Sequence, residues 1–308
     1  MIGASLRWKY PKPNGSLSKS SKCDLIAMRR EWRTLSMAQK HQYLEAVKCL
    51  KRWPSSLGLN QSYYDDFPWI HSRIGEYVHD AAPFLAWHRY FVHVYEIALM
   101  DACAYDGTIP YWNWELDWED VTASPIWDAE HGFGSNGQPN KSKEDIVKGY
   151  CVSDGPFKEW EILYLDEEYY PHCLSRGFLT GEELEAQSES LVPERIEELL
   201  DVPNYNSFNL GLENGPHLAI PRSIRGDFSL LTAPSDPVFF LHHTQLDRLW
   251  WRWQSRERTR IAQYEGLAAH HSHESASITD LLKMGGLAPD IPVLRVLDTE
   301  SEPLCYRY

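Results

Sequence analysis

No segment of the sequence gathers lysine and arginine. Its 308 residues contain 30 Lys and Arg against 44 Asp and Glu, so the formal net charge is −14 with histidine neutral. Binding to phosphate groups needs a basic stripe or patch. We therefore expect no nucleic-acid partner and no attraction to an anionic membrane surface.

Long apolar runs are also absent. The longest, such as residues 83–87 and 238–241, are far shorter than the roughly 20 residues that span a bilayer. Residues 1–21 contain no apolar core of a secretory signal. If Met1 is the native start, the sequence predicts a soluble, cytoplasmic protein with reduced thiols.

The six cysteines do not form the close pairs typical of zinc ribbons or redox dithiols, since no Cys-x-x-Cys occurs. Their even number permits three disulfides or none.

Strand-like alternation and internal repeats are missing too, and helical patterns are present instead. A capping box at Ser36 predicts a helix over 37–53. The sequence predicts a second helix with Asp66 as its N-cap and Pro68 in its first turn. A third helix is expected over 83–104.

The second half of the chain continues the helical pattern. We expect helices over 193–200, directly after Pro216, and over 236–256. Residues 107–156 are predicted to form a long loop held by aromatic side chains. The acidic stretch 159–201 is predicted to be a solvated face. The fold class is therefore predicted as mainly α, a helix bundle.

We predict an N-terminal arm over 1–22 and a single domain over 23–308. The apolar and acidic faces are compatible with a homo-oligomer.

Six of the 13 histidines form two groups. His71, His79 and His88 lie on two successive helices and the turn between them, where a bundle would bring them together. His217, His242 and His243 form a second group farther along the chain. Three imidazoles around an open position suit Zn or Cu, and affinity alone favours Cu.

Two segments carry a family resemblance. Residues 79–89, His-Asp-Ala-Ala-Pro-Phe-Leu-Ala-Trp-His-Arg, continuing to Glu96, resemble the first signature of the tyrosinase and hemocyanin (type 3 copper) family. Residues 236–247, Asp-Pro-Val-Phe-Phe-Leu-His-His-Thr-Gln-Leu-Asp, resemble the second signature, which assigns the ligand role to His243 rather than His242. The resemblance implies a four-helix bundle with long loops that holds two coppers, each on three histidines.

Carried over to this chain, the resemblance places metal site A on His71, His79 and His88. Site B falls on His217, on the residue four positions later, and on His243. That middle residue is Pro221, which has no metal-binding atom. Site B is therefore expected to keep two histidines at most, and to be weak.

An incomplete site B favours chemistry without dioxygen. A zinc ion at site A would polarise a carbonyl or epoxide oxygen. The chain resembles fungal cyclopenases in this respect, which implies a metal-dependent, non-redox lyase of quinolone alkaloid biosynthesis. The implied reaction converts cyclopenin into viridicatin with loss of methyl isocyanate, which hydrolyses to methylamine and CO2.

Other residues receive roles under this hypothesis. His217, His243 and His242, without a second metal, are candidates for proton transfer. Glu213 is a candidate for orienting His217. The small aromatic substrate is expected to contact Leu218, Arg222 and Arg225.

Two further functions remain open. The chain could be a dicopper o-diphenol (catechol) oxidase in which His242 or another residue supplies the missing ligand, with Cu in place of Zn. It could also be a non-catalytic protein that binds dioxygen or metal.

Overall fold

The computed structural model describes residues 22–139 and 147–308. Most of the predicted arm over 1–22 therefore lies outside the described residues. Lys22 is described and forms an isolated bridge with Ser301.

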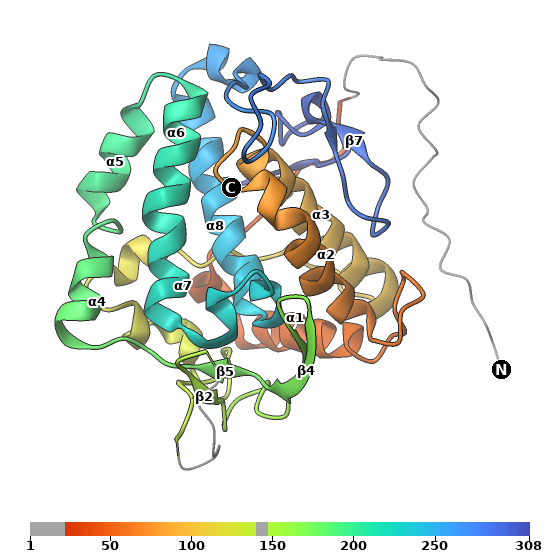
Figure 1. Cartoon of the computed structure of the whole chain (residues 1–308), viewed down its shortest axis with the longest axis vertical. Helices are drawn as coiled ribbons and strands as arrows, with labels where there is room; N and C mark the ends of the chain where they lie inside the picture. Colours follow the sequence, from red (N-terminus) through yellow and green to blue (C-terminus); the bar gives the residue numbers. More distant parts are fainter. Residues whose placement is uncertain (1–21, 140–146) are drawn as a thin grey trace.

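Helices dominate the described residues, which confirms the predicted mainly α bundle. They are α1 (Met37–Leu50), α2 (Tyr63–Val78), α3 (Pro83–Cys103), α4 (Gly181–Ser188), α5 (Pro193–Asp201), α6 (Tyr205–Leu212), α7 (Leu218–Ile224) and α8 (Val238–Arg256). Figure 1 shows α2, α3, α8 and the α6–α7 segment in the body of the molecule, with α4 and α5 on one flank. None of the helices in the described part of the chain is long and apolar enough to cross a membrane.

Two helix starts show how local signals work in this fold. The capping box at Ser36 begins α1 as predicted. Helix α2 begins earlier than predicted, because Ser62 and Asp65 form a capping box there. Asp66 is not the N-cap: its carboxylate accepts hydrogen bonds from the chain before the helix. Pro68 consequently lies inside the helix rather than in its first turn.

Short strands, which the sequence pattern does not predict, border the bundle. They are β1 (Ala27–Met28) with β8 (Tyr306–Arg307), β2 (Tyr150–Cys151) with β5 (Ser175–Arg176), β3 (Glu161–Leu165) with β4 (Glu168–Cys173), and β6 (Leu281–Leu282) with β7 (Ile291–Pro292). Of these four pairs, β1 and β8 are parallel and the other three are antiparallel. Most of these strands have two residues, too few to show an alternating pattern.

In the described part of the predicted loop over 107–156, short 3₁₀ helices and β2 interrupt the irregular chain, and buried aromatic side chains hold it, as predicted. Trp112, Trp114 and Trp127 are all at most 5% exposed. The side chain of Asn113 accepts a hydrogen bond from Gln245 Nε2 at 3.0 Å. The loop is therefore attached to α8 next to the histidine pair.

Three disulfides join the six cysteines, so the predicted reduced thiols are wrong. They are Cys23–Cys305, Cys49–Cys103 and Cys151–Cys173, with Cα–Cα distances of 5.5, 5.8 and 5.5 Å. Sequence spacing could not reveal these pairs because the partners meet only in the folded chain. A cytoplasmic location stays a prediction, and the disulfides weigh against it because they persist in oxidising compartments.

The Cys23–Cys305 disulfide spans 282 residues of sequence and joins the two ends of the domain. Replacing both cysteines with serine should lower the free energy of unfolding by about 2–4 kcal/mol, because the unfolded chain gains freedom. Denaturant unfolding of the variant and the parent measures this difference. As a control, thiol titration of the denatured, unreduced parent should find no free thiol, and six free thiols would contradict the pairing.

Candidate metal centre

Site A lies where α2 meets α3. His71 projects from α2, His79 is the C-cap of α2, and His88 lies in the second turn of α3. One ligand atom from each of the three lies within 4.8 Å of the others. The turn between the helices therefore brings together the three histidines that the sequence predicts.

Backbone carbonyls orient these imidazoles. Nδ1 of His71 lies 2.6 Å from Leu231 O, Nδ1 of His79 lies 2.7 Å from Gly75 O, and Nδ1 of His88 lies 2.8 Å from Phe84 O. A carbonyl oxygen only accepts hydrogen bonds, so each Nδ1 carries the proton. The Nε2 lone pairs are then free to bind a metal.

The spacing of Nε2 atoms in site A tests whether a metal fits. Nε2 of His71 lies 3.2 Å from Nε2 of His88. Two lone pairs that face each other at this distance need a shared cation. Nitrogen ligands at tetrahedral positions around zinc, with metal–nitrogen bonds near 2.0–2.1 Å, would be about 3.3 Å apart. The residues present therefore fit a bound metal ion.

Site B combines α8 with the turn before α7. His217 ends a π-helical turn over Glu213–His217, and His242 and His243 are neighbours on α8. Ligand atoms of these three histidines also lie within 4.8 Å of one another. The ring centroid of His217 lies 5.7 Å from that of His242 and 5.3 Å from that of His243.

The structure places a third imidazole at site B, where the sequence predicts two histidines at most. Pro221 does line the site and supplies no ligand, as predicted. However, His242 lies beside His217 and His243 as a third imidazole. Both ring nitrogens of His242 are buried and make no hydrogen bond of good geometry among the described residues, although the backbone of His217 lies near enough to oppose the lowering of the His242 pKa. A buried imidazole of this kind is a candidate metal ligand. The assignment of the ligand role to His243 rather than His242 stays a prediction, and the geometry makes His242 a candidate ligand as well.

Buried ion pairs hold α8 in position on either side of the histidine pair. The guanidinium of Arg176 binds both carboxylate oxygens of Asp236, at 2.7 and 2.9 Å. Asp247, one turn after His243, pairs with Arg89 of α3 and with Arg29. Because these groups are buried, α8 has little freedom to shift relative to α3.

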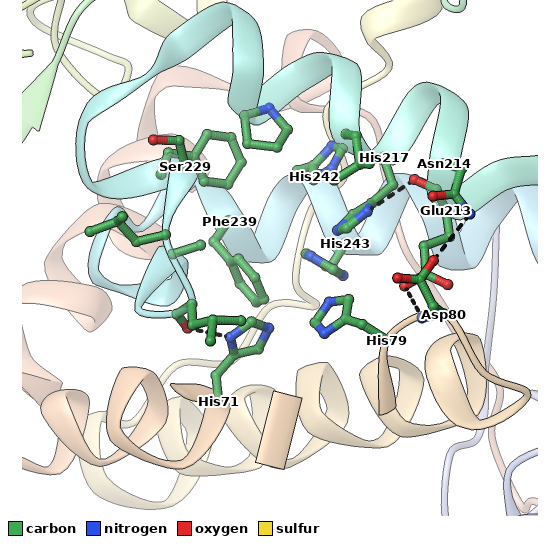
Figure 2. Close-up of a pocket in the computed structure, with 16 residues that line it drawn as sticks. His71, His79, Asp80, Glu213, Asn214, His217, Ser229, Phe239, His242 and His243 are labelled. Atoms are coloured by element: carbon green, nitrogen blue, oxygen red, sulfur yellow. Dashed lines mark hydrogen bonds between the residues drawn. The ribbon is translucent and has the colours of Figure 1, made fainter. Parts of the chain in front are cut away.

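The two triads face each other across one cavity. The rings of His88 and His243 stack with their centroids 4.3 Å apart, and those of His79 and His217 stack at 5.7 Å. The cavity between them has a volume of about 280 Å³ (Figure 2). It is lined by His71, His79, Asp80, Glu213, Asn214, His217, Leu218, Pro221, Phe228, Ser229, Leu230, Leu231, Ala233, Phe239, His242 and His243.

Burial keeps all six imidazoles neutral. It lowers the pKa of His71 and of His242 to about 3, and lowers the pKa of the other four as well. Neighbouring histidines lower most of these pKa values further. A neutral imidazole is the form that binds metal, so no proton has to leave at neutral pH. Proton transfer by His217, His242 and His243 needs a pKa near neutrality; it stays a prediction, and the lowered pKa values weigh against it.

Glu213 contacts His217 in a different way from the predicted one. The backbone carbonyl of Glu213, 3.2 Å from Nδ1 of His217, orients that ring, and the carboxyl group does not. Instead, Oε1 of Glu213 accepts a hydrogen bond from the backbone N–H of Asp80 at 2.8 Å. Burial raises the pKa of the Glu213 carboxyl to about 8.

The predicted substrate contacts separate in the structure. Leu218 lines the cavity, whereas Arg222 and Arg225 do not. Arg222 is exposed, and Arg225 donates a hydrogen bond to Glu183 at 3.0 Å. Helix α7 turns these two side chains away from the site, which one sequence without its tertiary contacts does not indicate.

Sequence reasoning missed the apolar side of the cavity. Phe228, from the 3₁₀ turn after α7, and Leu230, from the loop that follows it, line the cavity there. The same reasoning also underrated His242, although the pair of adjacent histidines in a buried apolar helix was an available signal.

Comparisons with known proteins point to one family. A family model described as the common central domain of tyrosinase matches residues 61–256. The tyrosinase-like protein phomQ1 of Diaporthe leptostromiformis is 46% identical over 305 residues, which cover 93% of this chain and 78% of that protein. The tyrosinase ustQ of Aspergillus flavus is 39% identical over 296 residues, which cover 96% of this chain and 82% of that protein.

A solved structure extends the likeness to the fold. The polyphenol oxidase of Thermothelomyces thermophila, in a mutant form, superposes with a TM-score of 0.78 at 28% identity, covering 92% of this chain and 88% of that one. Two histidine triads in such a fold suggest a metal-binding enzyme, typically of copper. The chain belongs to the tyrosinase family.

Proposed function

We propose that the protein oxidises o-diphenols with two copper ions, one in each triad. The observation that carries this proposal is the position of His242, which with His217 and His243 completes a second triad beside the first. Converting an o-diphenol into an o-quinone removes two electrons. Two metal sites across one cavity suit such a reaction, whereas a single site does not.

The donor set favours copper over zinc. Both triads consist of neutral imidazoles, and such nitrogen sites bind Cu²⁺ more tightly than Zn²⁺. When bound, a copper pair supplies the electron-accepting capacity that dioxygen then restores. The reaction balances without any other reagent: two diphenols give two quinones, and one dioxygen becomes two water molecules.

The chain itself would orient a small aromatic substrate and exclude water. Phe239 lies with its ring centroid 5.1 Å from that of His71 and 4.0 Å from that of His243. Together with Leu218 and Phe228 it offers apolar surface for a flat ring. The ring would be held next to the imidazoles of both triads.

A zinc-dependent, cyclopenase-type lyase is the competing proposal. Its premise is a mononuclear centre, because Pro221 supplies no ligand. With His242 beside His217 and His243 that premise loses its support. Zinc would fit either triad, but a redox-inactive ion needs no partner site.

Metal analysis combined with oxygen uptake tests the proposal. We expect about two copper ions per chain after loading, oxidation of 4-methylcatechol, and one dioxygen consumed for every two quinones formed. Without dioxygen, quinone formation should stop after a single turnover. About one zinc per chain that resists copper loading, with oxygen-independent turnover of a cyclopenin-type epoxide, would overturn the proposal in favour of the lyase.

A further inference from the structure

The three histidines of site A differ in what orients them. Nδ1 of His79 and Nδ1 of His88 each face the carbonyl four residues earlier in the chain, so the helix that carries each ring also orients it. His71 is different: its Nδ1 lies 2.6 Å from the carbonyl of Leu231, 160 residues farther along the chain (Figure 2). The direction of the His71 ring therefore depends on the position of a distant segment.

The segment that contains Leu231 is neither helix nor strand. It connects the 3₁₀ turns Gly226–Ser229 and Ala233–Ser235, and Leu231 itself is 38% exposed. While its carbonyl faces His71, its N–H donates a hydrogen bond to Oδ1 of Asp166 at 2.9 Å. An exposed connection of this kind needs a contact from outside to fix its carbonyl, and Asp166 supplies one.

Asp166 lies in the two-residue turn of the hairpin formed by β3 and β4. Its φ of +51° is in the left-handed region, which Asp tolerates better than most residues. In this conformation its own N–H donates to Oγ1 of Thr232 at 3.3 Å, and Thr232 is fully buried. Two hydrogen bonds of opposite direction thus join the hairpin turn to Leu231 and its neighbour.

The base of the hairpin is anchored to the rest of the fold. A disulfide joins Cys173, the last residue of β4, to Cys151 of β2. Beside it, Nε2 of His172 lies 2.7 Å from Oδ1 of Asp227, which is fully buried in the 3₁₀ turn before the Leu231 segment. The hairpin and the Leu231 segment are therefore held together at the base of the hairpin as well as at its turn.

The hairpin also contacts α2, the helix that carries His71. The ring centroid of Tyr164 in β3 lies 4.8 Å from that of Trp69, and Trp69 precedes His71 by two residues. The hairpin consequently packs against the helix of His71 and binds the segment whose carbonyl orients His71. It is placed to fix the position of one relative to the other.

We propose that Asp166 is a positioning residue for site A, because its carboxylate holds the Leu231 carbonyl where that carbonyl directs the His71 imidazole toward a metal ion. The proposal rests on the part of the proposed function that puts a metal ion in site A. Asp166 does not line the cavity, so it acts only through Leu231. Groups that support a metal ligand typically change metal affinity by about 10–100-fold, and we expect an effect at the lower end from Asp166, which is one hydrogen bond more distant.

Copper binding to site A alone measures this contribution. His217→Ala removes an imidazole of site B, so the full chain should then bind about one copper ion, in site A. In this background, Asp166→Gly removes the carboxylate, and glycine adopts the left-handed backbone without strain. The copper dissociation constant, measured by competition with a chelator, should rise about tenfold. The hyperfine coupling in the copper(II) EPR spectrum should also change, because the His71 ring is less restrained.

Two matched variants in the same background separate the hydrogen bond from the charge. Asp166→Asn keeps an acceptor oxygen for the Leu231 N–H and tolerates the left-handed backbone, so the dissociation constant should stay within about twofold. Glu167→Gln removes a charge from the exposed neighbour in the same turn and should change neither copper affinity nor the EPR spectrum. If Asp166→Asn weakened copper binding as much as Asp166→Gly, the charge would be responsible and the positioning role would be wrong.

Thr232→Val gives a second test, which also serves if Asp166→Gly folds poorly. Valine has nearly the same shape as threonine but cannot accept the hydrogen bond from the Asp166 N–H, so copper binding should weaken by about threefold. A loss of stability in these variants with an unchanged dissociation constant and an unchanged EPR spectrum would show that the contact is merely structural, and would overturn the proposal.

The results also distinguish this proposal from the oxidase itself. Weaker copper binding in Asp166→Gly, together with a parent protein that does not oxidise 4-methylcatechol, would support the positioning role and overturn the oxidase. Oxidation of 4-methylcatechol by the parent, with equal copper affinity of site A with and without Asp166→Gly, would leave the oxidase standing and overturn the positioning role.

Discussion

Replacing His242 with alanine is expected to lower the copper content from about two ions per chain to about one and to abolish catechol oxidation. Two imidazoles, His217 and His243, would remain in site B. Loss of a residue that only supports a metal ligand costs 10–100-fold in affinity or activity, so loss of a ligand should reduce oxidation by more than about 100-fold. Copper analysis and oxygen uptake with 4-methylcatechol measure both effects.

His41→Ala is the control for copper bound at the surface, because the His41 side chain is 73% exposed. It should change neither copper content nor oxidation. If His242→Ala kept two copper ions and full activity, His242 would not be a ligand.

Residue 221 of site B can be tested in the same His242→Ala background. Pro221 lines the site, so a histidine placed there would face the imidazoles of site B. Pro221→His alone should leave the copper content unchanged, because the second triad is already complete. In combination with His242→Ala it should restore part of the second copper. An unchanged copper content in the double variant would place residue 221 out of reach of the metal.

The second large effect is expected on stability, from Asp247→Asn. The Asp247 carboxylate pairs with the buried guanidiniums of Arg89 and Arg29 and accepts hydrogen bonds from Tyr306 and Tyr308. Glu96 pairs with Arg29 at 2.6 Å, so the four charged groups are balanced. Removing one buried charge should lower the free energy of unfolding by about 3–5 kcal/mol. Denaturant unfolding of the metal-free protein measures the loss.

A surface ion pair provides the matched control. Asp201 pairs with Arg256, and its side chain is 77% exposed. Asp201→Asn should therefore cost less than about 1 kcal/mol. Equal losses in the two variants would mean that the buried network contributes no more than a surface pair.

The stability difference should also depend on pH. Burial by itself raises the pKa of Asp247, but Arg89, Arg29 and the two tyrosine hydroxyls outweigh it and lower the pKa below its usual value. A lowered pKa in the folded state stabilises the protein above the usual pKa of aspartate, and this contribution is lost as the pH falls through the folded-state pKa. The difference in the free energy of unfolding between the parent and Asp247→Asn should therefore become smaller in acid.

Much of the architecture could be predicted from local signals. The capping box at Ser36, the proline at the start of α3 and the periodic apolar residues of α8 act within a few residues of chain, so they can be recognised without knowing the fold. The first triad follows from the same locality. His71, His79 and His88 lie on two helices joined by a short turn, which leaves few ways to arrange them.

Contacts between distant segments could not be predicted in this way. The three disulfides join residues 22 to 282 positions apart, and the sequence alone left their pairing open. The carbonyls that orient the imidazoles, such as Leu231 for His71, are invisible in a sequence because every residue has one. The hydrogen bond from Arg225 to Glu183, which directs Arg225 away from the cavity, could not be predicted either, because the two residues are far apart in the sequence.

By itself, the sequence determined most of the helices, the first histidine triad and the resemblance to the tyrosinase family, since each depends on residues close together in the chain. Only the tertiary structure placed His242 beside His217. Neighbouring residues on a helix point about 100° apart, so helical periodicity alone assigns one of them to the site. The turn that carries His217 packs against α8 between His242 and His243, and both imidazoles consequently reach the same site.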